Sequence, residues 1–227
     1  MKSKKIIVAL DSNNLNKTIK LVKILKRDVF AFKIGYQFFY NFGLKGYGEV
    51  YSICPKIFLD LKLHDIPNTV EMGLESLIKL KPIFTTIHIS GGDDMMKATK
   101  ISKKNTKILG VSILTSMDEK QTKKYYNQDN ILKLVKKFTK LAKKNTLDGV
   151  VCSPREISYI RKEVGKNFII VTPGIRLESN IKKDDQKRVE SPKKAIDSGA
   201  NYLVIGRPIT KSKDPLKVLK EINKTLS

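Results

Sequence analysis

Cysteine is scarce in this sequence, and its placement excludes several kinds of site. The two cysteines, Cys54 and Cys152, lie far apart and belong to no CxxC or Cys/His cluster. Such clusters are the usual signature of a zinc site or a redox pair. We therefore expect two reduced, partly buried thiols, with neither a disulfide nor a bound metal.

Long apolar runs are also missing. No stretch approaches the length that a membrane-spanning helix requires. The basic start at residues 1–5 leads into a short apolar run, but Asp11 interrupts it and no small-residue cleavage site follows, so no secretory signal is expected. The sequence predicts a cytoplasmic protein that has no membrane partner.

Acidic residues are few relative to basic ones. The chain has 45 Lys and Arg against 22 Asp and Glu, a formal net charge of +23. Such an excess would suit a nucleic-acid binder, because Lys and Arg neutralise phosphates. The lysines are spread through nearly every expected helix, however, so we expect solvated faces and no nucleic-acid partner. The positive field would favour the approach of a small anionic substrate.

Several catalytic signatures are absent as well. No GxGxxG follows the first expected strand, which disfavours a dinucleotide cofactor. No Ser-His-Asp order or nucleophile elbow occurs, and no carboxylate and histidine set has metal-ligand spacing. The chemistry must therefore come from other residues.

Short apolar, β-branched runs recur along the whole chain and predict eight strands. Continuous runs of this length are typical of parallel strands covered on both faces. Strands are expected at 6–10, 29–34, 57–61, 85–89, 108–114, 149–152, 168–171 and 202–205. Helical spacing between them, without a linker, predicts a single-domain α/β protein over residues 1–227, a closed (β/α)8 TIM barrel.

Helices are expected at 15–26, 69–79, 95–104, 131–144, 154–164, 192–198 and 215–225. The stretch at 131–144 is the clearest, with an apolar stripe opposite a row of lysines. A membrane-binding or partner-binding helix would have the same pattern, but an outer barrel helix that packs its stripe on the sheet is favoured.

Charged residues stand at the ends of the first three expected strands, where a barrel of this kind carries its active site. Asp11 ends the first strand, Lys33 the second, and Asp60 and Lys62 the third. Asp60 and Lys62 are two residues apart, so both should point into the barrel mouth, with Asp65 in the loop beyond. The group is either a structural ion-pair cluster or a preorganised catalytic array.

The last two strands end in glycine and arginine. Pro173, Gly174 and Arg176 follow the seventh, and Gly206 and Arg207 follow the eighth. Loops at these places commonly bind phosphate in barrel enzymes, although a glycine turn with a solvated arginine is the alternative. His88, at the end of the fourth strand, is either a hydrogen-bonding structural residue or a supporting site residue.

The segment DLKLHDIPNT, from Asp60 to Thr69, closely resembles the signature of bacterial orotidine 5'-phosphate decarboxylases. The resemblance continues through VALD at residues 8–11, LTS at 114–116, DGVVCS at 148–153, VTPGIR at 171–176 and IGRP at 205–208. It therefore covers essentially the whole chain. It implies a decarboxylase that forms UMP without a cofactor, in pyrimidine biosynthesis.

The resemblance also implies particular roles. Lys62 would donate a proton to C6 of the substrate, with Asp60 near the substrate carboxylate, and Lys33 would complete the charged network. The active site would lie at a homodimer interface, with Asp65 and Thr69 reaching into the neighbouring subunit. The remaining substrate-binding residues would be Asp11 and Lys33 at the ribose, Thr115 at the pyrimidine, Gly206 and Arg207 at the phosphate, and Arg176, Gln186 of a mobile loop, Pro173 and His88 around them.

A metal-dependent sugar-phosphate decarboxylase or aldolase of the same superfamily is the rival interpretation, since those relatives share the Asp-x-Lys-x-x-Asp pattern. They carry an acidic residue where this chain has Lys33. An ammonium group there would repel a divalent cation, which disfavours the rival.

Overall fold

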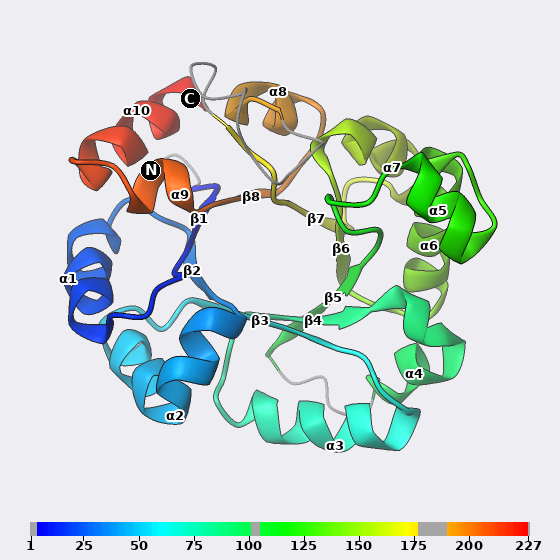
Figure 1. Cartoon of the computed structure of the whole chain (residues 1–227), viewed down its shortest axis with the longest axis horizontal. Helices are drawn as coiled ribbons and strands as arrows, with labels where there is room; N and C mark the ends of the chain where they lie inside the picture. Colours follow the sequence, from blue (N-terminus) through cyan, green and yellow to red (C-terminus); the bar gives the residue numbers. More distant parts are fainter. Residues whose placement is uncertain (1–3, 101–104, 177–189, 227) are drawn as a thin grey trace.

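The computed structural model of the chain describes residues 4–100, 105–176 and 190–226. Within these residues, eight parallel strands pair in chain order and close into a barrel, with helices in a ring outside it (Figure 1). This confirms the predicted (β/α)8 barrel. The strands are β1 (Ile6–Ala9), β2 (Ala31–Ile34), β3 (Ile57–Leu63), β4 (Phe84–His88), β5 (Lys107–Val111), β6 (Gly149–Val151), β7 (Ile169–Thr172) and β8 (Tyr202–Ile205).

The helices connect the strands. They are α1 (Leu15–Leu25), α2 (Tyr36–Ile53), α3 (Pro67–Ile78), α4 (Gly92–Ala98), α5 (Glu119–Tyr126), α6 (Ile131–Lys144), α7 (Ile157–Val164), α8 (Pro192–Asp197), α9 (Arg207–Thr210) and α10 (Pro215–Thr225), with the 3-10 turns η1 (Ile89–Gly91) and η2 (Pro154–Glu156). Within the described residues, none is long and apolar enough to span a membrane.

Two apolar layers hold the barrel together. Side chains alternate along each strand, so one set fills the barrel and the other packs under the helices. The inner layer includes Phe58, Phe84 and Leu109. The outer, larger layer includes Leu134 and Phe138 of α6, so the apolar stripe of that helix lies against the sheet, as predicted.

Helices α2 and α5 were not predicted. Glycine disfavours a helix interior, and α2 contains Gly43, Gly46 and Gly48. At Gly43 the backbone takes φ 54° and ψ −145°, so α2 is two helical segments joined across a kink. Helix α5 has almost no apolar stripe and buries only Thr122, but Asp118 and Gln121 form a capping box at its start.

Some predicted bounds were wrong by a few residues. The strand expected at 108–114 ends at Val111, and the strand expected at 57–61 continues to Leu63. The helix expected at 154–164 divides into η2 and α7, and the one expected at 95–104 runs over Gly92–Ala98, with 101–104 outside the described residues. Strand and helix ends depend on contacts with neighbouring elements, which local patterns do not record.

Candidate active site

A cavity of about 270 Å³ opens at the C-terminal ends of the strands. Part of its apolar lining comes from the inner barrel layer, and its polar lining comes from residues at the strand ends and in the loops after them. The apolar side chains include Phe58, Val111, Ile113, Val151 and Val204; the polar and loop residues include Asp11, Lys33, Asp60, Lys62, Thr115, Pro173, Gly174, Arg176, Gly206 and Arg207. A larger, more open groove of about 680 Å³ near the starts of α5 and α6 contains none of them.

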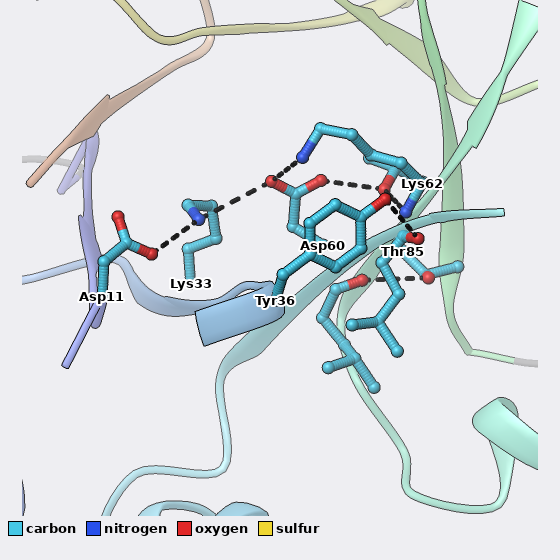
Figure 2. A network of polar contacts seen from close by, with 9 residues as sticks. Asp11, Lys33, Tyr36, Asp60, Lys62 and Thr85 are labelled. Carbon is cyan, nitrogen blue, oxygen red and sulfur yellow. Dashed lines mark hydrogen bonds and ion pairs between the residues drawn. The ribbon is translucent and has the colours of Figure 1, made fainter. Parts of the chain in front are cut away.

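Four charged side chains form a continuous array along one side of the cavity (Figure 2). Lys33 Nζ lies 3.5 Å from Asp11 Oδ1 and 3.7 Å from Asp60 Oδ2. Lys62 Nζ lies 2.8 Å from the same oxygen of Asp60. Acid and base thus alternate from Asp11 to Lys62, in the order that the strand ends predicted.

Asp60 is the most enclosed member, with 10% of its side chain exposed. Burial alone would raise the pKa of Asp60, but the ammonium groups of Lys33 and Lys62, with hydrogen bonds from Lys62 and Thr86, hold that pKa below its usual range. Asp60 is therefore a fixed carboxylate at neutral pH, and it holds two ammonium groups toward the cavity.

Lys62 has an unusual backbone. Its φ is 44°, a left-handed conformation that few L residues adopt. The pairing of β3 with β4 advances from Leu59↔Thr85 to Leu63↔Ile87, so β3 carries two extra residues there. This β-bulge replaces the regular alternation from which the shared orientation of Asp60 and Lys62 was predicted, although both still reach the cavity.

Tyr36, at the start of α2, lies beside Lys62 (Figure 2). The ammonium of Lys62 is 5.4 Å from the centre of the Tyr36 ring, and the Tyr36 hydroxyl donates a 3.2 Å hydrogen bond to the Leu61 carbonyl. A cation over an aromatic face is attracted to it. Lys62 is thus held by Asp60 on one side and by an aromatic ring on another.

Another part of the cavity lining comes from the ends of β7 and β8. Arg176 is buried, 7% exposed, and its guanidinium donates a 2.8 Å hydrogen bond to the Ile175 carbonyl. Gly206 precedes α9, and the exposed Arg207 is the first residue of that helix. Two arginines and a glycine turn therefore line the same cavity as the charged array, an arrangement that suits an anionic group such as a phosphate.

Comparisons with known proteins agree with this geometry. A sequence model described as "Orotidine 5'-phosphate decarboxylase / HUMPS family" matches residues 4–222. The orotidine 5'-phosphate decarboxylase of Wolbachia sp. subsp. Brugia malayi (strain TRS) is 45% identical over 224 residues, which are 98% of this chain and 99% of that protein. The enzyme of the same name from Ehrlichia chaffeensis is 42% identical over 225 residues, 98% of this chain and 96% of that one. The chain belongs to this family.

A solved relative supports the same assignment in three dimensions. Orotidine 5'-phosphate decarboxylase from Lactobacillus acidophilus has a TM-score of 0.85 at 36% identity, covering 99% of this chain and 100% of that one. The family and the enzyme class predicted from the motifs, a decarboxylase, are thereby confirmed.

Not every predicted site residue lies in the cavity. Asp65 and Thr69 are exposed, and the Asp65 carboxylate accepts a 2.7 Å hydrogen bond from the Ile66 amide instead of joining the array. His88 is absent from the cavity lining. Its ring lies 5.2 Å from that of His64, and burial, followed by the positive charges of His64 and Lys62, lowers its pKa. Gln186 lies outside the described residues.

The sequence reasoning missed three residues of this region. Thr86 lies in β4 and bonds to the array, Tyr36 lies against Lys62, and the buried thiol of Cys152 lines the cavity. Strand alternation could have found Thr86, because it shares a face with His88 two residues later. No local signal marks Tyr36 as a neighbour of Lys62.

The array offers no evident place for a metal ion. In the ranges described, no group of three or more His, Cys, Asp or Glu side chains is arranged to hold one. Each carboxylate of the array already has an ammonium within 4 Å, at the distances given above. A divalent cation there would meet two positive charges.

Proposed function

We propose that the chain converts orotidine 5'-phosphate to UMP and carbon dioxide, without a metal or other cofactor, as a step of pyrimidine biosynthesis. The observation that carries the proposal is the array of Asp11, Lys33, Asp60 and Lys62, which shares one cavity with Arg176 and Arg207. The relatives named above are decarboxylases of this nucleotide. Two free, buried cysteines agree with the reducing cytosol.

The reaction breaks the bond between C6 of the pyrimidine and its carboxylate. The electron pair stays on C6, carbon dioxide leaves, and C6 then takes a proton. Lys62 is the proposed donor: its ammonium stabilises the developing negative charge at C6 and supplies the proton, after which the amine recovers one from water. Asp60 keeps Lys62 oriented and lies where the substrate carboxylate would be, so it favours loss of that group by charge repulsion.

The wall with Arg176, Gly206 and Arg207 would bind the phosphate. Asp11 and Lys33 would hold the ribose, and Thr115 the pyrimidine, with Pro173 beside it. Binding energy from the phosphate, remote from C6, would then hold the reacting carbon against the array. His88, which does not line the cavity, and Gln186, which lies outside the described residues, remain proposed substrate contacts.

The first test is the ultraviolet absorbance change on mixing the purified chain with orotidine 5'-phosphate and a metal chelator. We expect conversion to UMP that the chelator leaves unaffected. Activity that appears only with an added divalent metal and a sugar phosphate would overturn the proposal in favour of the metal-dependent relatives.

The role of Lys62 has a separate test. Lys62→Ala should fold and bind UMP, but we expect kcat to fall at least about 10⁴-fold, because both the proton donor and its charge are lost. Lys97→Ala is the matched control, since Lys97 is an exposed lysine that pairs with Asp94, outside the array. Near-normal turnover by Lys62→Ala would rule out its proposed role.

We also propose that the chain acts as a homodimer with shared active sites. The support is a set of large apolar side chains exposed on α2, the β3–α3 loop and α3, the elements on either side of β3: Tyr36, Tyr40, Leu44, Ile66 and Met72. Large exposed apolar side chains on such neighbouring elements are typical of an interface. Asp65 and Thr69 lie in the same region, are exposed, and do not line the cavity of their own subunit.

Sedimentation equilibrium would test the dimer, and Tyr40→Glu, which places a charge at a side chain that is 77% exposed, should shift it to monomer. Shared sites have a sharper test. Lys62→Ala and Asp65→Ala, each inactive alone, should recover about a quarter of wild-type activity when refolded together, because half of the mixed dimers' sites are intact. Absence of recovery in confirmed mixed dimers would contradict the shared site.

A further inference from the structure

Thr86, in β4, has a hydroxyl group between two parts of the charged array. The residue is fully buried. Its Oγ1 accepts a 2.9 Å hydrogen bond from the backbone amide of Lys62 and donates a 2.9 Å hydrogen bond to Asp60 Oδ1. A hydroxyl has one proton to give, and the carboxylate can only accept, so the direction of both bonds is determined.

The β-bulge explains why the Lys62 amide needs this partner. Between Leu59 and Leu63, β3 has two more residues than β4 opposite it, so the regular ladder is interrupted there. A backbone amide inside the protein must find another acceptor. Thr86 supplies it, and thereby holds Lys62 at φ 44°.

The same hydroxyl acts on Asp60 from the other side. Asp60 Oδ2 accepts from Lys62 Nζ, while Oδ1 accepts from Thr86. Both oxygens are therefore held, and the plane of the carboxylate is determined. The contacts thus form a closed ring. The Lys62 backbone amide bonds to Thr86, Thr86 bonds to the Asp60 carboxylate, and that carboxylate bonds to the Lys62 ammonium.

We propose that Thr86 is a positioning residue for the decarboxylation: its hydroxyl holds the Lys62 backbone and the Asp60 carboxylate so that the Lys62 ammonium meets C6. This inference rests on the proposed function. Thr86 itself is absent from the cavity lining and acts through Lys62 and Asp60.

Thr86→Val, which keeps the shape and removes the hydroxyl, is the test variant. It leaves the Lys62 amide without its acceptor and Asp60 with one bond fewer, so both groups can leave their positions. We expect kcat to fall about 10²-fold, as for small misplacements of catalytic groups. The dissociation constant of UMP should change less than about threefold, because the phosphate wall lies on β7 and β8.

Thr85→Val is the matched control. Thr85 is the neighbouring residue of the same strand, is also fully buried, and its hydroxyl donates a 3.0 Å hydrogen bond to the Leu59 carbonyl, away from the array (Figure 2). The Thr85→Val variant should lose about as much free energy of unfolding as Thr86→Val, but its kcat should stay at the wild-type value. Thr86→Ser, which retains a hydroxyl, should recover most of the activity lost in Thr86→Val.

An equal fall of kcat in both valine variants, or a kcat of Thr86→Val within threefold of wild type, overturns the proposal. If Thr86→Val does not fold, Thr86→Ala is compared with Thr86→Ser in the same way. A carbon-13 NMR titration of the Asp60 carboxyl gives a readout independent of turnover. The pKa of Asp60 should be higher in Thr86→Val than in wild type, because the hydrogen bond from Thr86 lowers it, and should be unchanged in Thr85→Val. If the wild type does not decarboxylate orotidine 5'-phosphate but the NMR difference is present, the proposed function is refuted, while the role of Thr86 in positioning Asp60 and Lys62 is retained.

Discussion

Replacing Asp60 by asparagine should remove the central charge of the array and keep the shape of the side chain. Its carboxylate lies 2.8 Å from Lys62 Nζ and 3.7 Å from Lys33 Nζ. Removal of one partner from a buried ion pair typically costs about 3–5 kcal/mol, because the other charge remains buried without compensation. The side chain of Lys33 is 13% exposed and that of Lys62 is 24% exposed, so neither charge is fully buried. We therefore expect the free energy of unfolding to fall by about 3 kcal/mol at pH 7.

Asp11→Asn is the matched control at the end of the same array. The side chain of Asp11 is 54% exposed, and its carboxylate lies 3.5 Å from the Lys33 ammonium. Exposed ion pairs contribute little, so this change should cost less than about 1 kcal/mol. The difference between the two variants reports the combined effect of burial and of the additional partners of Asp60.

Chemical denaturation followed by circular dichroism is the assay, since the chain has no tryptophan. The pKa of Asp60 is lowered in the folded state, so its stabilisation is full above the unfolded value of about 3.9 and is lost as the pH falls through the folded value. The gap between wild type and Asp60→Asn should therefore persist down to about pH 5 and shrink below about pH 4. Equal losses in Asp60→Asn and Asp11→Asn, or a gap that acid does not change, would refute the reasoning.

Three further predictions concern other residues. In Gly35→Ala, the new Cβ would lie 2.8 Å from Lys33 Nζ. We expect the flexible end of the Lys33 side chain to move, so that kcat falls roughly 10-fold or more while the fold is retained. An unchanged kcat would contradict the placement of Lys33. In Gly149→Ala, the Cβ would lie 2.2 Å from the Ile169 carbonyl oxygen; denaturation should show a loss of about 2–3 kcal/mol, against no loss for Gly48→Ala, where the Cβ meets nothing within 4 Å. Burial lowers the pKa of His88 in the fold, so wild-type stability should fall as the pH drops below about 6.5, and His88→Gln should show a smaller fall in the same titration.

Much of the fold could be predicted because the relevant signals are local. Each strand is a short apolar run, and the helix at 131–144 has its own apolar stripe. Helix α2 could not be predicted, because its glycines weaken the helical signal and Gly43 places a kink inside it. The barrel packing of α2, not its local propensity, decides that this segment is helical.

The members of the charged array could also be predicted, since parallel strands of a barrel bring their carboxyl ends to one mouth. The order Asp11, Lys33, Asp60, Lys62 follows from the order of the strands. Asp65 lies in the loop after β3, as predicted. The direction of its side chain could not be predicted, because a loop residue has no strand geometry that directs it.

The sequence by itself determined the order of the eight strands, most of the helices between them, and which charged residues end the first three strands, because these depend on spacing along the chain. Only the tertiary structure decided how those charges are held. The left-handed backbone of Lys62 and the bond from Thr86 to Asp60 depend on the register of β3 against β4. The ring of Tyr36 beside Lys62 depends on where α2 begins over the barrel mouth. These contacts join residues more than 20 positions apart, and no local pattern encodes their distances.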